Sequence, residues 1–598
     1  MRNNLYAVFS MLLFFISTSQ AQQWKIVEGN IMTRFAKQVK SDNALPEYPR
    51  PQMVRPQWQN LNGLWDCTVT KKDTTMPQKF DKKILVPYPV ESALSGIKQA
   101  LRPDQRLWYK RNISKPKFLN NKRFLLHFGA VDYKATIYIN GKQIGEHVGG
   151  YNPFSFDITD ELKNNDNELV VSVWDPTESD IIARGKQILT PVSAWYTATS
   201  GIWQTVWLEE VPAVYIQHIQ LIPNVDSSFL SVKIDLNNQS KNVQVEIKAL
   251  EGTKLVSKTS GLASSLIKLP VENAHLWSTT DPFLYDLKIS ISKNGKNLDE
   301  VSSYFGMRKI SVKKDSKGFD RICLNDKPVF NLGVLDQGFW PEGAYTAPTD
   351  SALWYDIDLM KQMGFTCIRK HIKVEPARWY YHCDRLGMMV WQDMPCRLFN
   401  MRIDKPEQKI QFEKEVKATI EQCKNYPSII MWVLYNEDWG AYDQERLTKE
   451  LKTADPSRLI NGHSGPSIRN WPSSDIADIH FYCYPSVFPK NESGKASVIG
   501  EFGGVNVVCK GHEWKPGEDW GHGKIHIWDI EYLYESMVDM LKRNAKEGLC
   551  GAIYTEPYDV EIEQNGLQSY DRAVIKIPVK RMNEINQELH KTYEEIAK

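Results

Sequence analysis

Alternating hydrophobic and polar positions dominate the first third of the chain. Leu64–Val69 has a period of two, which is typical of a half-buried strand. Ala135–Ile139 and Gln143–His147 flank the dipeptide Asn140-Gly141, which two-residue hairpin turns prefer. This pattern predicts a β-sandwich or jelly roll over residues 22–210, with an extension before its first strand.

The same alternation continues in a second, shorter unit. It appears in Leu230–Leu236, Val243–Leu250 and Leu284–Ile291. A unit of about 100 residues built from short alternating strands is typical of an immunoglobulin-like β-sandwich. We place this sandwich at residues 211–308.

From residue 309 onward, short apolar runs alternate with longer segments of helical period. Ile429–Leu434 is apolar on both faces, as a strand buried between a barrel interior and its helices must be. The expected strands are Val329–Leu335, Thr366–Arg369, Met389–Trp391, Ile429–Tyr435, Arg458–Asn461, Ile479–Tyr482, Ser497–Gly500 and Gly551–Tyr554. The expected helices include Leu353–Met363, Pro376–Leu386, Gln408–Cys423 and Tyr532–Lys546. This repetition predicts a C-terminal (β/α)₈ TIM barrel over residues 309–598.

The first 21 residues have the layout of a secretory signal peptide. The basic residue Arg2 precedes an apolar run over residues 5–16, and small residues over 19–21 predict cleavage after Ala21. The apolar run is shorter than the ~20 residues that a membrane span needs, and no later segment supplies one. We therefore expect a periplasmic or secreted protein without a membrane span.

Charge and cysteine content narrow the function classes. Lys+Arg 74 against Asp+Glu 72 gives a net charge of +2, which provides no field for attracting nucleic acid. The nine cysteines are spread over the chain without a Cys-x-x-Cys pair, which fits buried thiols better than a disulfide framework or a zinc site. The spacing leaves open one disulfide within the group from Cys367 to Cys423.

Active sites of such barrels lie where the strands end at the carboxyl face, so polar residues at the expected strand ends are the candidates. They are Asp336, Gln337, Arg369, Lys370, His371, Gln392, Asp393, Asn436, Glu437, His463, His480, Tyr482, Glu501, Thr555 and Glu556. Glu437 and Glu501 follow unusually apolar strands, where a carboxylate is poorly solvated. The fourth and seventh strands lie across the barrel mouth, so both carboxylates can face one ligand. A salt bridge to Arg369 is the purely structural alternative for each.

Two opposed carboxyl groups in a neutral, aromatic-rich extracellular protein indicate glycoside hydrolysis. One carboxyl must be protonated to donate to the leaving oxygen, and the other must be ionised to attack the anomeric carbon. Aromatic residues make up 11% of the chain, and their rings suit sugar faces as well as ordinary sandwich cores. Glu556 and Asp393 are rival carboxylates for these two roles.

Two segments carry a resemblance to a known family. Trp432–Glu437 resembles the acid/base motif of glycoside hydrolase family 2, the β-galactosidase, β-glucuronidase and β-mannosidase group, and Gly500–Gly504 resembles its nucleophile motif. Segments similar to its galactose-binding-like jelly roll and its middle sandwich are Trp108–Arg111, Ser200–Gln204, His275–Trp277 and Pro282–Tyr285. The resemblance covers nearly the whole chain after the signal peptide.

The resemblance implies a retaining mechanism through a covalent glycosyl-enzyme. Glu501 would be the nucleophile and Glu437 first the acid and then the base, with carboxyl groups about 5 to 5.5 Å apart. Asn436 would bind the sugar 2-hydroxyl. Tyr482 would hold the nucleophile, and Arg369 would favour its ionised form.

Further residues are expected to bind substrate. His371 would contact sugar hydroxyls or serve as a plain hydrogen-bonded histidine, because the spacing here is Arg-x-His where many relatives have Arg-x-x-His. Trp391 and Trp195 are candidate stacking faces for a sugar ring, with a place in the core as the alternative. Asp336, at the end of the first strand, is the remaining candidate.

Departures from the family pattern limit the substrate. The glucuronidase Asn-x-Lys pair for the sugar acid is expected after the eighth strand, where Glu563–Leu567 has no lysine. A uronic acid is therefore disfavoured unless another cation such as Lys370 substitutes. Asp393–Cys396 lacks the acidic and histidine pair that binds magnesium in some large galactosidases, so we predict no metal. The jelly-roll loop that brings an aspartate to the sugar in relatives is Pro191–Tyr196 here, which also weakens the case for galactose.

We predict a retaining exo-glycosidase that removes a terminal, β-linked neutral sugar from an oligosaccharide or glycoside, as a β-galactosidase does, without a cofactor. The alternatives on this scaffold are β-glucuronidase, β-mannosidase and α-L-arabinosidase activity. The alternative from another class is a non-catalytic carbohydrate-binding protein. The sequence leaves open whether the chain forms a homo-oligomer.

Overall fold

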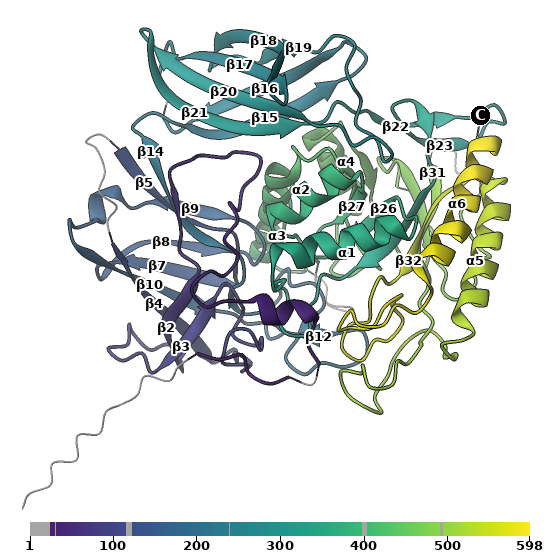
Figure 1. The fold of residues 1–598 in the computed structure, drawn as a ribbon, viewed down its shortest axis with the longest axis horizontal. Coiled ribbons are helices and arrows are strands. Elements are labelled where there is room, and N and C mark those ends of the chain that lie inside the picture. Colours follow the sequence, from purple (N-terminus) through teal and green to yellow (C-terminus); the bar gives the residue numbers. More distant parts are fainter. Residues whose placement is uncertain are drawn as a thin grey trace, which may run out of the picture.

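The computed structural model consists of a jelly roll, a β-sandwich and a barrel in chain order (Figure 1). It describes residues 24–29, 31–114, 122–238, 240–396, 403–469, 471–490 and 494–597. The predicted signal peptide, residues 1–21, lies outside the described residues. No helix in the described part of the chain is long and apolar enough to cross a membrane. All nine cysteines are free thiols, and eight of them are buried.

Two antiparallel sheets form the jelly roll, in the orders β3-β2-β4-β10-β7-β8 and β1-β14-β5-β9. The elements are η1 Arg34–Gln38, β1 Trp58–Asn60, β2 Gly63–Lys71, β3 Lys82–Val86, β4 Gln105–Ser114, β5 Lys122–Phe128, β6 Val131–Asp132, β7 Lys134–Ile139, β8 Lys142–Val148, β9 Phe154–Asp157, η2 Thr159–Glu161, β10 Asp166–Trp174, β11 Gln187–Ile188, β12 Tyr196–Thr197, β13 Gly201–Ile202 and β14 Val206–Pro212. Inward-facing residues such as Trp65, Leu107 and Phe128 make one buried core. The predicted hairpin is confirmed, because β7 and β8 pair around Asn140 and Gly141, which both have the positive φ that the turn requires.

The second body packs the three-stranded sheet β15-β16-β19 against the four-stranded sheet β18-β17-β20-β21. The strands are β15 Ile216–Asn224, β16 Phe229–Leu236, β17 Gln244–Glu251, β18 Lys254–Leu262, β19 Ile267–Pro270, β20 Tyr285–Lys293 and β21 Lys296–Phe305. Alternate residues such as Val232, Ile247 and Ile289 are buried between the sheets. This arrangement confirms the predicted immunoglobulin-like sandwich.

Eight parallel strands in the order β29-β28-β27-β26-β25-β32-β31-β30 form a nearly closed barrel, as predicted. They are β25 Asn331–Asp336, β26 Cys367–Lys370, β27 Met389–Asp393, β28 Ile429–Val433, β29 Leu459–Asn461, β30 Ile476–His480, β31 Ala496–Gly503 and β32 Leu549–Thr555. The helices are α1 Asp350–Gln362, α2 Ala377–Leu386, α3 Pro406–Cys423, α4 Gln444–Ala454, α5 Ile530–Ala545 and α6 Val579–Ile596. Every residue of the eight strands is buried, because the interior covers one face and the outer layer the other.

Two strand boundaries differ from the expected ones in a way that matters for the site. β30 begins three residues earlier, at Ile476, and ends before Tyr482. The buried Asp478 interrupts its apolar run, but that carboxylate accepts hydrogen bonds from the Gly500 backbone N–H and the Asn461 amide, so the strand continues through it. β31 continues past Glu501, because its backbone still pairs with β32 beyond that residue.

A small sheet at the amino ends of the barrel strands determines which end is open. It consists of β22 Ile310–Lys314, β23 Asp320–Leu324 and β24 Lys327–Pro328. Ile322 and Leu324 of β23 pack with Trp391 and Met431 inside the barrel. Arg321 donates to the backbone oxygen of Leu549, the first residue of β32. The carboxyl ends of the strands therefore form the end of the barrel that a ligand can reach.

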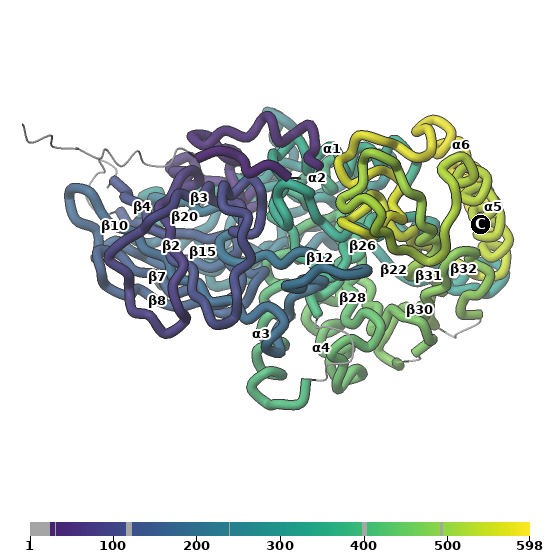
Figure 2. Tube along the Cα trace, turned by 90° about the horizontal axis from the view of Figure 1, so that it is seen from below, coloured from purple at the N-terminus to yellow at the C-terminus, as the bar shows by residue number. Residues whose placement is uncertain are grey.

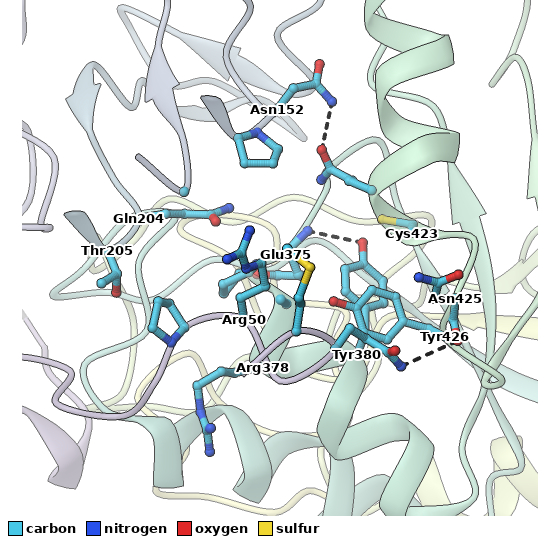
Figure 3. Close-up of a pocket in the computed structure, with 18 of the residues that line it drawn as sticks. Arg50, Asn152, Gln204, Thr205, Glu375, Arg378, Tyr380, Cys423, Asn425 and Tyr426 are labelled. Atoms are coloured by element: carbon cyan, nitrogen blue, oxygen red, sulfur yellow. Dashed lines mark hydrogen bonds between the residues drawn. The ribbon is translucent and has the colours of Figure 1, made fainter. Parts of the chain in front are cut away.

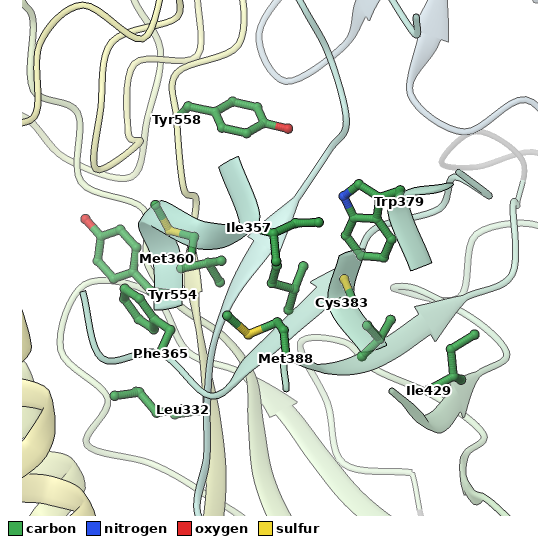
Figure 4. Close-up of a cluster of buried hydrophobic side chains, with 14 of the residues drawn as sticks. Leu332, Ile357, Met360, Phe365, Trp379, Cys383, Met388, Ile429, Tyr554 and Tyr558 are labelled. Carbon is green, nitrogen blue, oxygen red and sulfur yellow. The ribbon is translucent and has the colours of Figure 1, made fainter. Parts of the chain in front are cut away.

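The barrel strands are held in place by a dense apolar layer beneath the helices (Figure 4). Ile357 and Met360 of α1 and Trp379 and Cys383 of α2 pack in one cluster with Leu332 of β25. Each fully buried side chain of this kind contributes about 1.5–3 kcal/mol to folding. This packing fixes the strand positions and so fixes where the residues at their carboxyl ends lie.

A cavity of about 410 Å³ lies where the three bodies meet (Figure 3). Its lining includes Asn152 of the jelly roll, Ile219 of the sandwich and Tyr380 of the barrel helix α2. Neither Glu437 nor Glu501 lines it. This interdomain cavity is therefore separate from the carboxylates at the barrel mouth.

The jelly roll rests on helix α3 through a buried carboxyl group. The Tyr133 hydroxyl donates to Glu415 Oε1 over 3.0 Å, and the Gln411 amide donates to the same oxygen over 2.7 Å. Gln411 also donates to the Val148 backbone oxygen at 3.1 Å. Burial raises the pKa of Glu415 to about 7, so the interface accommodates the neutral carboxyl better than the charged one.

We expect Glu415→Gln to remove a pH-dependent loss of stability. The unfolded carboxyl loses its proton near pH 4.5 and the folded one near 7, so this group makes the wild type less stable as pH rises between these values. The variant keeps a neutral hydrogen-bonding group and should gain up to about 3 kcal/mol over the wild type between pH 5 and pH 8. Urea unfolding across this range measures the difference.

Glu421→Gln on the same helix is the control, because that side chain is 56% exposed. Its difference from the wild type should remain below about 1 kcal/mol and constant with pH. A constant difference for Glu415→Gln as well would contradict the role of the buried carboxyl.

Candidate functional site

The structure brings Glu437 and Glu501 together at one nitrogen of the His480 imidazole ring. His480 Nδ1 lies 2.9 Å from Glu437 Oε1 and 3.6 Å from Glu501 Oε1. Glu437 follows β28, Glu501 lies within β31, and His480 ends β30. Two carboxylates that are distant in sequence therefore face one point at the barrel mouth. The Glu437 side chain is 22% exposed and that of Glu501 6%, so solvent reaches the pair from the side of Glu437.

Backbone pairing beyond β28 positions Glu437. Asn436 forms a parallel bridge with Ser464, and the Glu437 N–H donates to the Ser464 backbone oxygen over 2.7 Å. Glu437 has a φ of +49°, a left-handed conformation that non-glycine residues adopt rarely and that turns the chain sharply here. Burial would raise the pKa of Glu437, but the hydrogen bond and charge of His480 outweigh burial and lower it.

Glu501 is held from two sides. The Tyr482 hydroxyl donates to its Oε2 over 2.6 Å, and Arg369 Nη1 donates to its Oε1 over 3.3 Å. The preceding Gly500 permits this placement, because a Cβ there would lie 2.4 Å from Ser464 Oγ and 2.5 Å from the Asp478 carboxylate. Strands β30 and β31 therefore approach closely enough for Tyr482 to reach the carboxylate.

Arg369 connects the site across three strands. Its Nη2 donates to Asp393 Oδ2 and to Asn436 Oδ1, each over 2.8 Å, and its side chain is fully buried. Burial raises the pKa of Asp393 to about 6, although Arg369 opposes this rise. The rival carboxylate Asp393 is thus the main partner of Arg369, and the guanidinium also orients the Asn436 amide.

His371 presents one free nitrogen to the site. Its Nδ1 lies 2.9 Å from Gln337 Oε1, and its Nε2 lies 3.9 Å from Glu501 Oε1 without a hydrogen-bond partner. Burial, with the nearby charges of Lys186 and Arg369, holds the pKa of His371 well below its ordinary value. The ring is therefore neutral, with Nδ1 donating to Gln337 and Nε2 able to accept from a hydroxyl.

Two predicted substrate-binding residues do not face the carboxylate pair. Trp391 lies in the barrel interior near the closed end, where its Nε1 donates to Asn331 Oδ1 over 3.0 Å. Asp336 is buried and accepts from Lys370 and from the Gly338 N–H, so its oxygens are occupied. The pattern located both on their strands correctly, but it could not show which way Trp391 points or which partners Asp336 has.

Residues 184–186 of the jelly roll reach the barrel mouth beside β12 (Figure 2), where the sequence had indicated only the neighbouring loop Pro191–Tyr196. The N–H groups of Arg184 and Gly185 donate to the Cys396 backbone oxygen over 3.2 and 3.1 Å. Gly185 has a φ of +63°, and a Cβ there would lie 2.7 Å from the Ile372 backbone oxygen. This anchoring brings the Lys186 ammonium to 3.9 Å from Glu563 Oε2 beyond β32.

Other residues of the site also have weak sequence signals. The His522 ring stacks on Tyr482 with centroids 3.5 Å apart, although it lies between β31 and α5. Trp195 is half-buried and packs against Trp439, with centroids 5.1 Å apart, at the jelly-roll side of the mouth. Only three-dimensional contact identifies His522, because it does not lie at the end of a barrel strand, whereas Trp195 is the candidate stacking face that the sequence already offered.

Glu556 and Asn565 beyond β32 contain buried polar atoms without partners. Both carboxylate oxygens of Glu556 and the Asn565 Oδ1 atom are buried and unpaired within the described residues. Burial, with the charge of Glu563, raises the pKa of Glu556 well above its ordinary value. Unpaired buried polar groups are costly, and they are often found where a ligand supplies the missing hydrogen bonds.

In the described ranges, no group of three or more His, Cys, Asp or Glu side chains is arranged so that it could hold a metal ion. The absence of a metal stays a prediction. The chemistry that the site offers on its own is a pair of carboxylates with a histidine between them and an arginine behind them.

Three family models match the chain in domain order. They are described as the glycosyl hydrolases family 2 sugar binding domain, over residues 49–212, glycosyl hydrolases family 2, over 214–308, and the glycosyl hydrolases family 2 TIM barrel domain, over 320–495. Glu437 lies within the barrel match and Glu501 just beyond it.

Relatives in sequence carry two different names. A putative beta-glucuronidase of Formosa agariphila is 29% identical over 348 residues, which cover 56% of this chain and 40% of that protein. A beta-galactosidase of Clostridium acetobutylicum is 26% identical over 367 residues, covering 57% of this chain and 39% of that protein. The chain thus spans about two fifths of the length of these relatives.

Solved structures share the fold over nearly the whole chain. The beta-glucuronidase of Ruminococcus gnavus superposes with a TM-score of 0.73 at 20% identity, covering 91% of this chain and 100% of that one. Domain order, barrel topology and the three family matches agree. The chain belongs to glycosyl hydrolases family 2.

Proposed function

We propose that the protein is a retaining exo-glycosidase in which Glu501 is the nucleophile and Glu437 the acid and base. The observation that carries this proposal is that both carboxylates face His480 Nδ1, at 2.9 and 3.6 Å. Because both oxygens lie near the same nitrogen, the distance between them cannot exceed the sum of these two distances. That sum equals the smallest carboxyl separation of inverting enzymes, ~6.5–9.5 Å, and the ~5–5.5 Å separation of retaining enzymes lies within it.

The surrounding contacts support these roles. Hydrogen bonds from Arg369 and Tyr482 stabilise the negative charge of Glu501, so it can attack the anomeric carbon. Burial and the charge of Glu501 raise the pKa of Tyr482 well above its ordinary value, so this phenol stays a donor. Asn436, oriented by Arg369, has its amide available to the sugar 2-hydroxyl. The unpaired Nε2 of His371 is a further hydroxyl acceptor.

A 2-fluoro glycosyl fluoride should inactivate the enzyme by labelling Glu501. Fluorine at C2 slows hydrolysis of the covalent intermediate, so the ester accumulates and peptide mass spectrometry can locate it. Glu501→Gln should take up no label and should lose at least about 10⁴-fold in kcat, since covalent catalysis is abolished. Glu518→Gln, at a glutamate of the following loop whose side chain is 59% exposed, is the control and should label like the wild type. Labelling of another carboxylate would refute the assignment, and a wild type that hydrolyses no glycoside would favour a carbohydrate-binding protein.

Glu437→Ala should slow substrates according to their leaving groups. Loss of the general acid costs about 10²–10⁴-fold when the aglycone needs a proton, and little when it is a dinitrophenolate. Added azide should restore turnover of the dinitrophenyl glycoside, because a small anion fits the space left by the carboxylate and attacks the intermediate without a base. Steady-state kinetics with dinitrophenyl and phenyl glycosides measure both effects. Equal losses on the two substrates would contradict the acid role.

We infer that the glycone is a neutral β-linked sugar, as in β-galactosidases. Lys370, the cation that the sequence offers for a sugar acid, already pairs with Asp336 and with Glu375 at 2.8 Å. Lys186 faces Glu563. The raised pKa of Glu556 keeps it neutral, and a neutral carboxyl can both donate to and accept from hydroxyl groups. Lys370 and Lys186 are thus already paired, which disfavours a carboxylate on the sugar.

A β-glucuronide is the second candidate substrate, and one structural observation and one comparison with relatives favour it. Lys186 is the cation that the jelly roll brings to the barrel mouth, 3.9 Å from Glu563. Several relatives, including those of Formosa agariphila and Ruminococcus gnavus, are named beta-glucuronidases. In this alternative the substrate carboxylate would compete with Glu563 for Lys186.

Kinetics with Lys186→Met should separate the two candidates. For a neutral-sugar enzyme, aryl β-galactosides should be cleaved faster than aryl β-glucuronides, and the variant should retain most of this activity. For a glucuronidase, loss of a charged hydrogen bond should cost about 10–10²-fold in kcat/KM on the glucuronide alone. Lys524→Met, at a lysine that is 60% exposed, is the control and should change neither substrate. A wild type that prefers the glucuronide would overturn the neutral-sugar proposal.

We also propose that the protein acts in the periplasm or outside the cell. This rests on the signal-like composition of residues 1–21. Cleavage after Ala21 would leave Gln22 at the N-terminus of the mature chain. A terminal exo-glycosidase there would act on oligosaccharides before or during their uptake.

A further inference from the structure

His480 occupies a position that the proposed mechanism has not used. Its imidazole is fully buried at the end of β30, and backbone hydrogen bonds fix it from both sides. The His480 N–H donates to the Gly465 backbone oxygen over 2.8 Å, and the next N–H, of Phe481, donates to the Glu501 backbone oxygen over 3.0 Å. The ring therefore has one orientation, with Nδ1 toward the two carboxylates.

The other ring nitrogen of His480, Nε2, also has hydrogen-bond partners. His480 Nε2 lies 2.8 Å from Ser464 Oγ and 3.3 Å from Arg369 Nη1. A serine hydroxyl can accept from a protonated Nε2 or donate to an unprotonated one. Ser464 is itself fixed, because it pairs with Asn436 and accepts from the Glu437 N–H. Arg369 can only donate and so opposes a proton on Nε2, which leaves Ser464 Oγ as the group that accepts from a protonated Nε2 without a change in the position of the ring.

The charges around His480 favour its protonated form. The groups that face it from other elements are the carboxylates of Glu437, Glu501 and Asp393, the guanidinium of Arg369 and the neutral ring of His371, and Tyr482 lies beside it on its own segment. Burial lowers the pKa of His480, but Glu501 and Glu437 outweigh burial and raise it. The pKa of Glu437 is lowered by the same contact.

This arrangement differs from the one expected of an acid catalyst. A general acid must carry a proton before the reaction, yet the contact with His480 favours ionised Glu437 in the free enzyme. The missing proton lies one hydrogen bond away, on a nitrogen 2.9 Å from the Glu437 oxygen. Neither the sequence nor the roles of Glu437 and Glu501 account for a histidine at this point.

We propose that His480 is a positioning residue that holds on Nδ1 the proton that Glu437 passes to the leaving aglycone. This inference rests on the proposed retaining mechanism. His480 itself does not touch the substrate in this account, and it acts through Glu437. The free enzyme at neutral pH then contains an imidazolium–carboxylate pair in place of a protonated glutamic acid.

The proton balance closes over one turnover. In the first step the Nδ1–H bond breaks as an O–H bond forms on Glu437, which gives that proton to the glycosidic oxygen. The electron pair of the glycosidic bond leaves with the aglycone, and a Glu501 oxygen bonds to the anomeric carbon. In the second step water attacks that carbon, its proton returns through Glu437 to His480 Nδ1, and the ester electrons return to Glu501. No other acid, base or redox partner is needed.

Loss of negative charge on Glu501 helps the first step. The ionised carboxylate lies 3.6 Å from Nδ1 and favours the imidazolium. When Glu501 becomes an ester this attraction disappears, so the proton leaves His480 more readily as the reaction advances. Regeneration of the carboxylate in the second step favours the return of the proton.

His480→Asn tests the proposal, because asparagine keeps a neutral donor but cannot carry an extra proton. The alkaline limb of the kcat/KM profile should move at least about one pH unit lower, since Glu437 must then hold the proton alone. The phenyl glycoside should lose about 10²-fold at pH 7 and the dinitrophenyl glycoside much less. Glu437→Ala supplies the reference for complete loss of the acid.

His382→Asn is the matched control. His382 is a buried histidine on α2 that lies 3.1 Å from the Asp350 carboxylate, away from the barrel mouth. Its substitution should leave both the alkaline limb and the leaving-group dependence as in the wild type. Ser464→Ala is the second test variant, because loss of the Nε2 partner disfavours the imidazolium and should also move the alkaline limb to lower pH.

The outcomes separate this inference from the proposed function. An inactive wild type that takes up no 2-fluoro label at Glu501 would refute the glycosidase itself. A labelled, active wild type with an unchanged alkaline limb in both His480→Asn and Ser464→Ala would overturn the role of His480 alone. Equal losses on both leaving groups in His480→Asn would likewise reduce His480 to a structural residue.

Discussion

The buried guanidinium of Arg369 is the interaction on which the barrel mouth depends. It donates to Asp393, Asn436 and Glu501 and to the Gly500 backbone oxygen, and so connects β26 to groups from three other strands or strand ends. Burying an ionised carboxylate costs several kcal/mol unless a cation and hydrogen bonds compensate it. Arg369 provides both. An acidic site can therefore form on strands whose residues are all buried.

Arg369 compensates only part of the negative charge at the site, and the uncompensated charge matters for the chemistry. The carboxylates of Asp393, Glu437 and Glu501 outnumber the permanent charge of Arg369 at the centre of the site. The deficit is met by a group that titrates, His480, and by a phenol that donates from Tyr482. A fully balanced site would hold its protons tightly, whereas this one contains a proton that a small change in charge can move.

Much of the fold, and the two candidate carboxylates, could be predicted from residue patterns along the chain, and the physical reasons can be named. Carboxylates after apolar strands, as at Glu437 and Glu501, are conspicuous because water cannot solvate them there. The Asn140-Gly141 turn and the three bodies were predictable from local periodicity. Side-chain direction and partners were not, so the sequence could not show that Trp391 takes the core position named as its alternative or that Asp336 pairs with Lys370. Lys186 and His522 were missed, because only tertiary contact brings them to the site.

The hydrogen bonds from the Arg184–Gly185 backbone to Cys396 place part of the jelly roll inside the catalytic end of the barrel. The boundary between the jelly roll and the barrel, which have separate cores, thus runs through the site. In the proposed mechanism, the residues that form bonds at the anomeric carbon belong to the barrel, and in the β-glucuronide alternative the cation that contacts the sugar acid, Lys186, belongs to the jelly roll. In that alternative, substitutions in the loop would alter which glycone is accepted while leaving the packing of the barrel strands intact, so selectivity and bond cleavage would be free to evolve separately.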